Sequence, residues 1–233
     1  MNEAVAAIKA KGYWQLVLRP QVYRADRLRV QPNATNLVQV IASVSVQLRG
    51  WDYPHTNLNE RIEIEQDCVG QTTSWTHFHE TWRCYRSGQF VHLAGMRHDW
   101  GAERQLGLTE RVPAEANILG IRDALFRLTE MLLFARGYCH LLIPGEAVDV
   151  LVEVGGLRER RLVVDSPSAF GFGDELVATT SNPYTVSFVV DAATTEDDAK
   201  RMAREGVAGL FGLFGWSTGD AILAGWQDEI RRW

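Results

Sequence analysis

Apolar and polar residues alternate along several short segments of this chain, most of them in its first half. The segment Tyr13 to Arg19 has a period of two and is ended by Pro20. The segment Leu37 to Leu48 has the same period, with valines separated by glutamine and serine. Such alternation is typical of an antiparallel β-strand with one face in the core and one in solvent. Similar patterns predict strands at 61–65, 147–154, 161–164 and 184–190 and a long hairpin over 69–99.

A period of three to four residues replaces the alternation after Pro113. Apolar side chains then form one stripe of a long amphipathic helix, which Gly137 is expected to end. The stripe consists of Ile118, Ile121, Leu125, Leu128 and Leu132. A short helix is also expected over residues 2–11, just before Gly12.

Two more helices are expected near the C-terminus. Thr194 and Thr195 precede three acidic residues, and a hydroxyl side chain followed by acids is typical of a helix N-terminus. This helix is expected to reach about Phe214, and the last one to begin at about Asp220. Glycines recur every third residue at 206, 209, 212 and 215. Because a glycine inside a helix costs about 1 kcal/mol relative to alanine, we expect another backbone to approach closely there.

These elements predict an α+β fold, in which an antiparallel, sheet-rich N-terminal half packs against three longer helices from the C-terminal half. The change of pattern divides the chain into a sheet-rich lobe, 1–105, and a helix–strand lobe, 106–233, with one continuous domain as the alternative. A hydrophobic content of 46% is enough to bury a sizeable core.

Composition and charge narrow the class of protein. No apolar run approaches the roughly 18 residues that a membrane-spanning helix needs, and the first residues do not resemble a secretory signal. Cys68, Cys84 and Cys139 have no paired spacing, which favours a reducing cytoplasm over a disulfide framework. The net charge of −5 disfavours nucleic acid as a partner, because that binding depends on neutralising phosphates.

The hairpin carries the most informative polar residues. A two-residue turn at Ser87-Gly88 would place Arg83 opposite His92 and His77 opposite His98. One face would then be apolar and turned to the core, and it consists of Phe78, Trp82, Cys84, Val91 and Leu93. The opposite face would collect His77, His79, Arg83, Tyr85, Phe90, His92, Met96 and His98.

This histidine-bearing face has three interpretations. His77, His79 and His98 could provide a facial set of metal ligands, because a His-x-His pair on a strand points both imidazoles the same way. Alternatively, Arg83, Tyr85 and the imidazoles bind a phosphate, a nucleotide or an acidic peptide. The third interpretation is a solvated polar sheet face without a ligand.

Glu80 is an acidic residue on the core side of the hairpin. A buried carboxylate needs a partner, and we expect an ion pair with Arg97, with a perturbed acid in a cleft as the alternative.

A local basic patch precedes the second predicted strand. It consists of Arg19, Arg24, Arg27 and Arg29, with Tyr13, Trp14 and Tyr23 nearby. Aromatic residues among arginines suit single-stranded nucleic acid, but the acidic chain favours a solvated edge instead.

Several aromatic motifs resemble those of a bacterial protein family. The hairpin run from His79-Glu80 to Gln89-Phe90, the segment Leu48-Arg49-Gly50-Trp51, and Phe214-Gly215-Trp216 with Gln227 resemble a C-terminal module of uncharacterised bacterial proteins, over about residues 36–232. That module follows a Schlafen-like, AlbA-type domain proposed to bind DNA or ATP, and some of these proteins are proposed to act in phage defence. This sequence has no counterpart of the DNA-binding domain, so the resemblance implies no nucleic-acid binding here.

The residues therefore predict a cytoplasmic, non-enzymatic sensor or protein-interaction module that binds a partner protein, a second copy or a small ligand. No pattern identifies a cofactor. The expected contact residues are the hairpin side chains together with Trp51 and Tyr53 of an aromatic loop. The alternative is a metal-dependent hydrolase or nuclease that uses the hairpin histidines.

Overall fold

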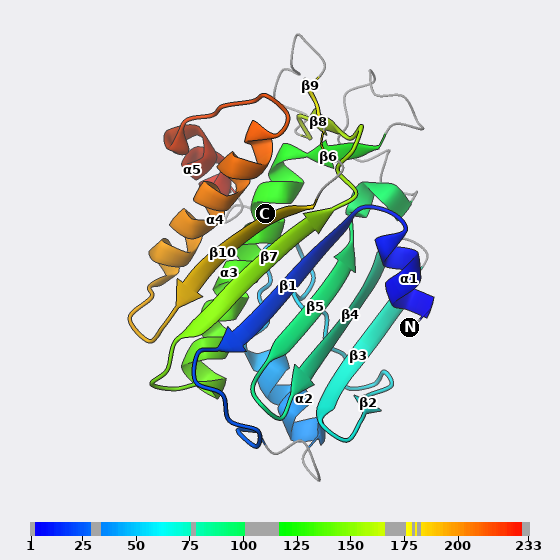
Figure 1. The fold of residues 1–233 in the computed structure, drawn as a ribbon, viewed down its shortest axis with the longest axis vertical. Helices are drawn as coiled ribbons and strands as arrows, with labels where there is room; N and C mark the ends of the chain where they lie inside the picture. The colour runs from blue at the N-terminus through cyan, green and yellow to red at the C-terminus, as the bar shows by residue number, and fades with distance from the viewer. Residues whose placement is uncertain are drawn as a thin grey trace.

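A seven-stranded antiparallel sheet forms the centre of the protein in its computed structural model (Figure 1). The strand order is β10-β7-β1-β5-β4-β3-β2. The structure describes residues 3–28, 34–75, 78–100, 117–165, 176–178, 180 and 183–229. The strands are β1 (Tyr13–Pro20), β2 (Glu63–Ile64), β3 (Cys68–Trp75), β4 (Phe78–Tyr85), β5 (Phe90–Gly95), β7 (Val148–Gly155) and β10 (Tyr184–Val190).

Among the described residues, the longer helices all lie on one side of this sheet, and the opposite side carries only a short one (Figure 1). Behind the sheet in this view are α2 (Ala34–Ser43) and α3 (Ile121–Leu142), while α4 (Glu196–Gly212) packs against α3 beside the β10 edge and α5 (Asp220–Glu229) packs against α4. In front lies α1 (Glu3–Lys9), which packs against one end of β4 and β5. A small second sheet at one end contains β6 (Ile118–Gly120), β8 (Arg161–Val163) and β9 (Leu176–Val177), and a 3-10 helix, η1 (Arg97–Trp100), lies beside β6.

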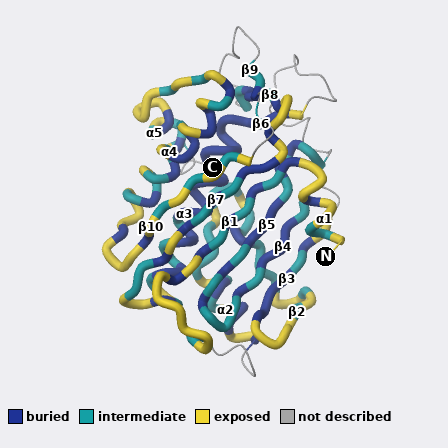
Figure 2. Tube along the Cα trace, in the orientation of Figure 1, coloured by how far each residue is buried: buried dark blue, intermediate teal, exposed yellow. Residues whose placement is uncertain are grey.

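The main core lies between the sheet and α3. Every second side chain of β1 points into it, and Trp14, Leu16 and Leu18 are at most 1% exposed. Figure 2 shows the resulting alternation of buried and less buried positions along the central strands. The two-residue period of the sequence therefore has its expected physical cause, since only one face of these strands is covered by helices.

The architecture confirms the predicted α+β class, with a sheet-rich N-terminal half and three longer helices from the C-terminal half. Strands from both sides of residue 105 take part in the same large sheet, because β1 pairs with β5 on one side and with β7 on the other. Within the described part of the chain, no helix has the length and apolar character needed to cross a membrane.

The predicted strand over 37–48 is wrong, because residues 34–43 form α2 instead. The buried residues of α2 are Ala34, Leu37, Val38 and Ile41, which follow the three-to-four-residue spacing of a helix. Ile41 is the residue that breaks the alternation in the sequence, and in the helix it is fully buried. The spacing of the valines is thus compatible with a strand, and the spacing of Leu37, Val38 and Ile41 in the same segment is compatible with a helix.

The long third helix begins and ends later than the sequence predicts. It starts at Ile121, directly after β6, and continues through Gly137 to Leu142. Asp165 accepts hydrogen bonds from the backbone N–H groups of Arg122 (2.7 Å) and Asp123 (2.9 Å) in its first turn. A carboxylate from another part of the chain thus caps the helix, which a local sequence pattern cannot show. Pro113 lies outside the described residues.

The start of α4 agrees with the sequence prediction, whereas the glycine repeat has other close neighbours than the one expected. Thr195 and Asp198 form a reciprocal capping box at the N-terminus. A Cβ atom on Gly206 would lie 2.5 Å from a methyl group of Leu128, and one on Gly209 would lie 2.4 Å from the Tyr184 hydroxyl. The neighbours that approach closely are side chains of α3 and β10, rather than the backbone that was expected.

Candidate functional site

The turn between β4 and β5 is one residue longer than the sequence predicts. The N–H of Tyr85 donates to the carbonyl of Gln89 (2.8 Å), and Gly88 has a φ of +82°. The loop is therefore Arg86-Ser87-Gly88, a three-residue connection with glycine in the left-handed position. As a result, Trp82 lies opposite His92 and Arg83 lies opposite Val91.

This shift of one residue reverses the two faces of β5. Phe90 and His92 point toward the helices, and Val91 and Leu93 point toward the opposite side, because side chains alternate along a strand. The predicted faces of β4 are correct, since Trp82, Cys84 and Glu80 are buried with the core and Arg83 and Tyr85 are not. The prediction that His92 shares a face with His79, Arg83 and Tyr85 is wrong.

A chain of buried polar groups occupies the helix side of the hairpin. The Tyr53 hydroxyl lies 3.1 Å from His92 Nδ1, and His92 Nε2 lies 3.2 Å from Glu80 Oε2. The other oxygen of Glu80 accepts a hydrogen bond from the backbone N–H of His55 (2.6 Å). These three side chains are at most 1% exposed. The partners of Glu80 are thus His92 and the backbone of His55, in place of the expected Arg97. This series of hydrogen bonds attaches the 53–55 segment to the sheet.

A buried ion cluster continues this polar layer toward α3. Arg49 donates to both carboxylate oxygens of Glu130 (2.9 and 2.7 Å) and also to Asp123. Arg127 lies 3.5 Å from Glu130 and 5.2 Å from the centre of the Tyr53 ring. Each of these side chains has a buried charged partner, which offsets the cost of removing it from water.

The ionisation of this cluster follows from its pairing. Burial alone would raise the pKa of Asp123, but Arg49 and the neighbouring cations hold it below its usual value. Burial would likewise lower the pKa of Arg49, and the carboxylates of Glu130 and Asp123 raise it instead. Both groups are therefore charged at neutral pH, and their ion pair links the 49–53 segment to α3.

The aromatic loop and the last hairpin histidine also lie on the helix side. Tyr53 is fully buried, whereas Trp51 is partly exposed and has the Arg97 guanidinium 4.8 Å from its ring centre. His98 is 9% exposed in η1 and lies near Asp123 of α3. His77 lies outside the described residues.

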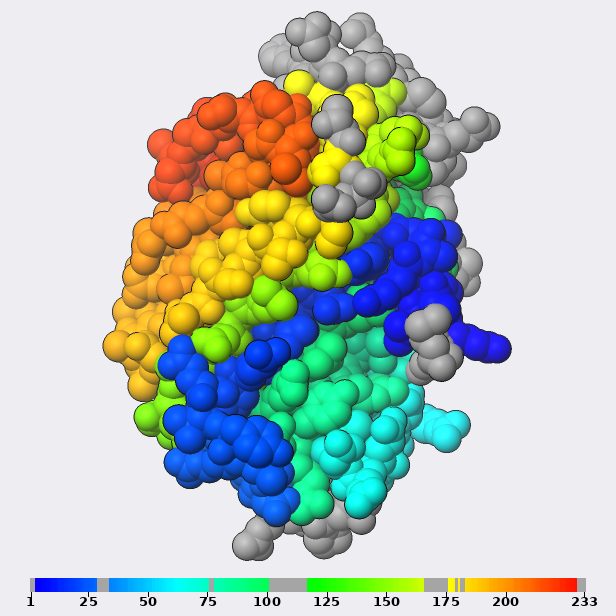
Figure 3. All heavy atoms as spheres, in the orientation of Figure 1, coloured from blue at the N-terminus to red at the C-terminus, as the bar shows by residue number. Residues whose placement is uncertain are grey.

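The opposite side of the sheet is an open surface. In Figure 3 the strands β10, β7, β1 and β5 form this surface without a helix in front of them. The strand registers define a row of side chains that crosses the strands at its centre. In order, the row consists of Ser187, Leu151, Val17, Val91 and Arg83. We call Leu151, Val17 and Val91 the apolar row; all three are partly exposed.

Charged and polar side chains border the apolar row. Arg83 forms an ion pair with Glu63, and the Tyr13 hydroxyl donates to Glu153 (2.7 Å). Burial, assisted by the Glu153 carboxylate, raises the pKa of Tyr13 to about 12. Arg19 lies opposite Asp149 on the other side of the row. An apolar centre with a polar rim is the usual composition of a protein–protein interface.

His79 lies on the open side, at the end that α1 covers. Its ring stacks on Trp100 with 3.7 Å between centres, and its Nδ1 lies 3.0 Å from Ser74 Oγ. Burial, together with the charge of Lys11, lowers the pKa of His79. His79 and His92 are on opposite faces of the sheet, so they cannot bind one ion.

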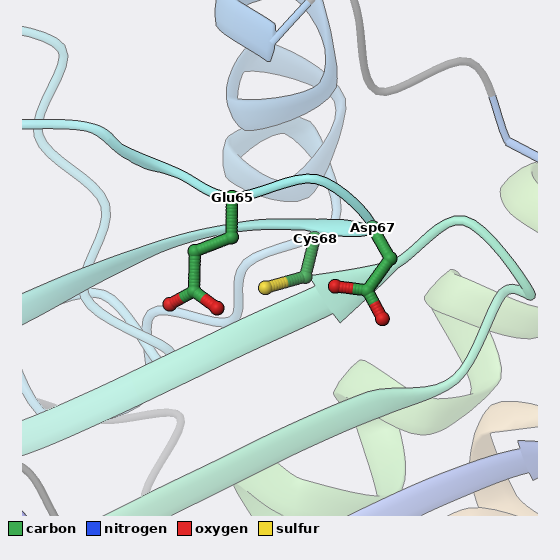
Figure 4. Close-up of side chains that lie close together, drawn as sticks. All are labelled: Glu65, Asp67 and Cys68. Carbon is green, nitrogen blue, oxygen red and sulfur yellow. The ribbon is translucent and has the colours of Figure 1, made fainter.

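One group of potential metal ligands occurs among the described residues, and it contains no histidine. Glu65, Asp67 and Cys68 have their ligand atoms within 4.8 Å of one another at the turn before β3 (Figure 4). Burial and the two carboxylates raise the pKa of the Cys68 thiol to about 11. The thiol is therefore protonated at neutral pH, and this group is two exposed acids beside a buried cysteine.

Two of the four arginines of the predicted basic patch pair with one glutamate. Glu146 binds Arg27 through two contacts (2.9 and 2.8 Å) and Arg24 through one (2.8 Å). Arg29 lies outside the described residues. These pairs reduce the positive potential that single-stranded nucleic acid would require.

Comparisons of the chain with family models, with curated proteins and with solved structures find no match. The resemblance to the C-terminal module of Schlafen-like proteins therefore stays a prediction.

Proposed function

We propose that this protein is a non-enzymatic interaction module that binds a partner protein through the open face of its sheet. The observation that carries the proposal is the apolar row of Leu151, Val17 and Val91, which lies on the part of this face that no helix of the described residues covers. A wide, open sheet suits a protein partner better than a small molecule, because small-molecule sites are concave.

The polar rim supports the same proposal. Arg83 and Tyr85, two of the contact residues predicted from the sequence, lie on this face beside the apolar row. Arg83 contributes a guanidinium that can exchange Glu63 for a carboxylate of the partner. Two of the other predicted contacts, Tyr53 and His92, are buried and belong to the stabilising polar layer.

Two features extend the proposal to a cellular context. Cys68, Cys84 and Cys139 are free, buried thiols, which is consistent with a reducing compartment such as the cytoplasm. The resemblance described above would place the module in bacterial phage defence, acting as a sensor of, or an adaptor for, another protein.

Site-specific photo-crosslinking in the native cell tests the proposal. A photoreactive residue at Val17 should give a discrete cross-linked product, which a second substitution, Leu151→Arg, should remove. The matched control is Asn36, an exposed position on α2 behind the sheet. A product of twice the chain mass would identify a second copy as the partner. No product from position 17, or an equal product from position 36, would contradict the proposal.

A further inference from the structure

A pocket of about 340 Å³ lies at one end of the large sheet, away from the apolar row. It lies where the turn between α1 and β1 meets η1 and the turn between β7 and β8 (Figure 1). Its polar and charged lining consists of Lys11, Asp99, Asn117, Arg158 and Arg160. Its volume is within the range of about 300–1,000 Å³ that is usual for small-molecule sites.

A buried ion pair fixes one wall of this pocket. Arg160 donates to both oxygens of Asp99 (2.8 and 2.7 Å), and the two side chains are 2% and 6% exposed. Arg160 also donates to the carbonyls of Gly156 (2.9 Å) and Ile118 (2.7 Å). The backbone N–H of Gly12 donates to Asp99 Oδ2 (2.7 Å). This wall is therefore rigid, and the charges of Arg160 and Asp99 cancel.

Two further cations remain in the lining. Lys11 is exposed, and its ammonium donates to the backbone carbonyl of Asp99 (2.9 Å) and lies 3.9 Å from the centre of a Trp100 ring. Arg158 is 68% exposed, and its contact with Glu159 is a loose one of 3.8 Å. A carbonyl and an aromatic ring hold Lys11 in place without cancelling its charge. The pocket is thus positive in a chain whose net charge is −5.

We propose that this pocket binds a small molecule through an anionic group, a phosphate or a carboxylate. Lys11 provides a compact ammonium and Arg158 a planar guanidinium, and both form charge-assisted hydrogen bonds with such groups. The Arg160–Asp99 pair positions the walls without competing for the ligand, because its own hydrogen bonds are already made. This proposal is independent of partner binding on the open face, since the two sites share no residue.

Calorimetric titration of the purified chain at low salt tests the site, with pyrophosphate as the phosphate probe and citrate as the carboxylate probe. Saturable binding of either probe at one site is expected. Lys11→Gln and Arg158→Gln should each weaken it about tenfold, the effect of one lost charge-assisted hydrogen bond. Comparing the two probes shows which anionic group the pocket prefers.

Arg61→Gln is the matched control, because Arg61 is exposed, carries the same charge and does not line the pocket. Binding in this variant should be unchanged, and circular dichroism should show that all three variants keep the fold. Absence of saturable binding of both probes at millimolar concentration would overturn the proposal. An equal loss in Arg61→Gln would also overturn it, because the attraction would then be a property of the whole surface.

Discussion

The two faces of the β4–β5 hairpin differ in what their polar residues do. On the helix side, Glu80 and His92 are buried and bind each other and the 53–55 segment. On the open side, Arg83 and Tyr85 are partly exposed beside an apolar row. Neighbouring residues of one strand can thus belong to the stabilising core and to a proposed binding surface. The comparison shows that polarity alone does not identify a functional residue; the face on which it lies also has to be known.

The largest expected effect comes from removing one buried charge. Arg49→Met leaves Asp123 without its guanidinium and Glu130 with Arg127 alone, so we expect the free energy of unfolding to fall by about 3–5 kcal/mol. Arg83→Met, on the open face, should cost at most about 1 kcal/mol. Urea unfolding of both variants measures the difference. Equal losses would remove the distinction between the faces.

A matched pair of tyrosines tests the same comparison on a smaller scale. Tyr53→Phe removes the hydroxyl that contacts His92 Nδ1 and leaves a buried nitrogen unpaired, so we expect a loss of about 1–3 kcal/mol. Tyr85→Phe should change stability by less than about 0.5 kcal/mol, because Tyr85 lies on the partly exposed side. Thermal and urea unfolding give both values. A greater loss in Tyr85→Phe would indicate that the open face is covered in solution.

The smallest expected effect concerns Tyr13, at the border of the open face. Its pKa is raised to about 12 by burial and by Glu153, so folding favours the neutral phenol. This contribution to stability is complete below a pH of about 10 and is lost as the pH rises from about 10 to 12. Wild type should therefore lose more stability than Tyr13→Phe over this range. Unfolding curves recorded at intervals of pH test this, and parallel losses would show that folding does not raise the pKa of Tyr13.

Much of the fold follows from local patterns in the sequence. The alternation along 13–19 predicts β1, and Thr195 with the acids after it predicts the start of α4. These predictions succeed because the forces that decide them act within a few residues. The strand predicted over 37–48 is wrong because the same pattern of valines fits both a strand and a helix. Packing against the sheet decides between the two, and the local sequence does not show that packing.

The site was harder to predict because its geometry depends on the length of one turn. In Phe90-Val91-His92-Leu93 apolar residues occupy both faces, so the pattern does not fix which side faces the core. The sequence did contain one indication of the correct register. Glu80 lies on the predicted core side of the hairpin, and its buried carboxylate needs a partner on the facing strand. His92 meets that need only with a three-residue turn. Arg49 could not be found, because its partners on α3 lie 74 and 81 positions further along the chain.

Chemical modification of the wild-type histidines tests the separation of the two faces most directly. Diethyl pyrocarbonate modifies accessible neutral imidazoles, and peptide mass spectrometry reads the rate at each position. The structure predicts modification of His79, on the open side, and protection of His92, which is fully buried between Tyr53 and Glu80. Modification of His92 at the rate of His79 in the native protein would contradict the hairpin register and the open face built on it.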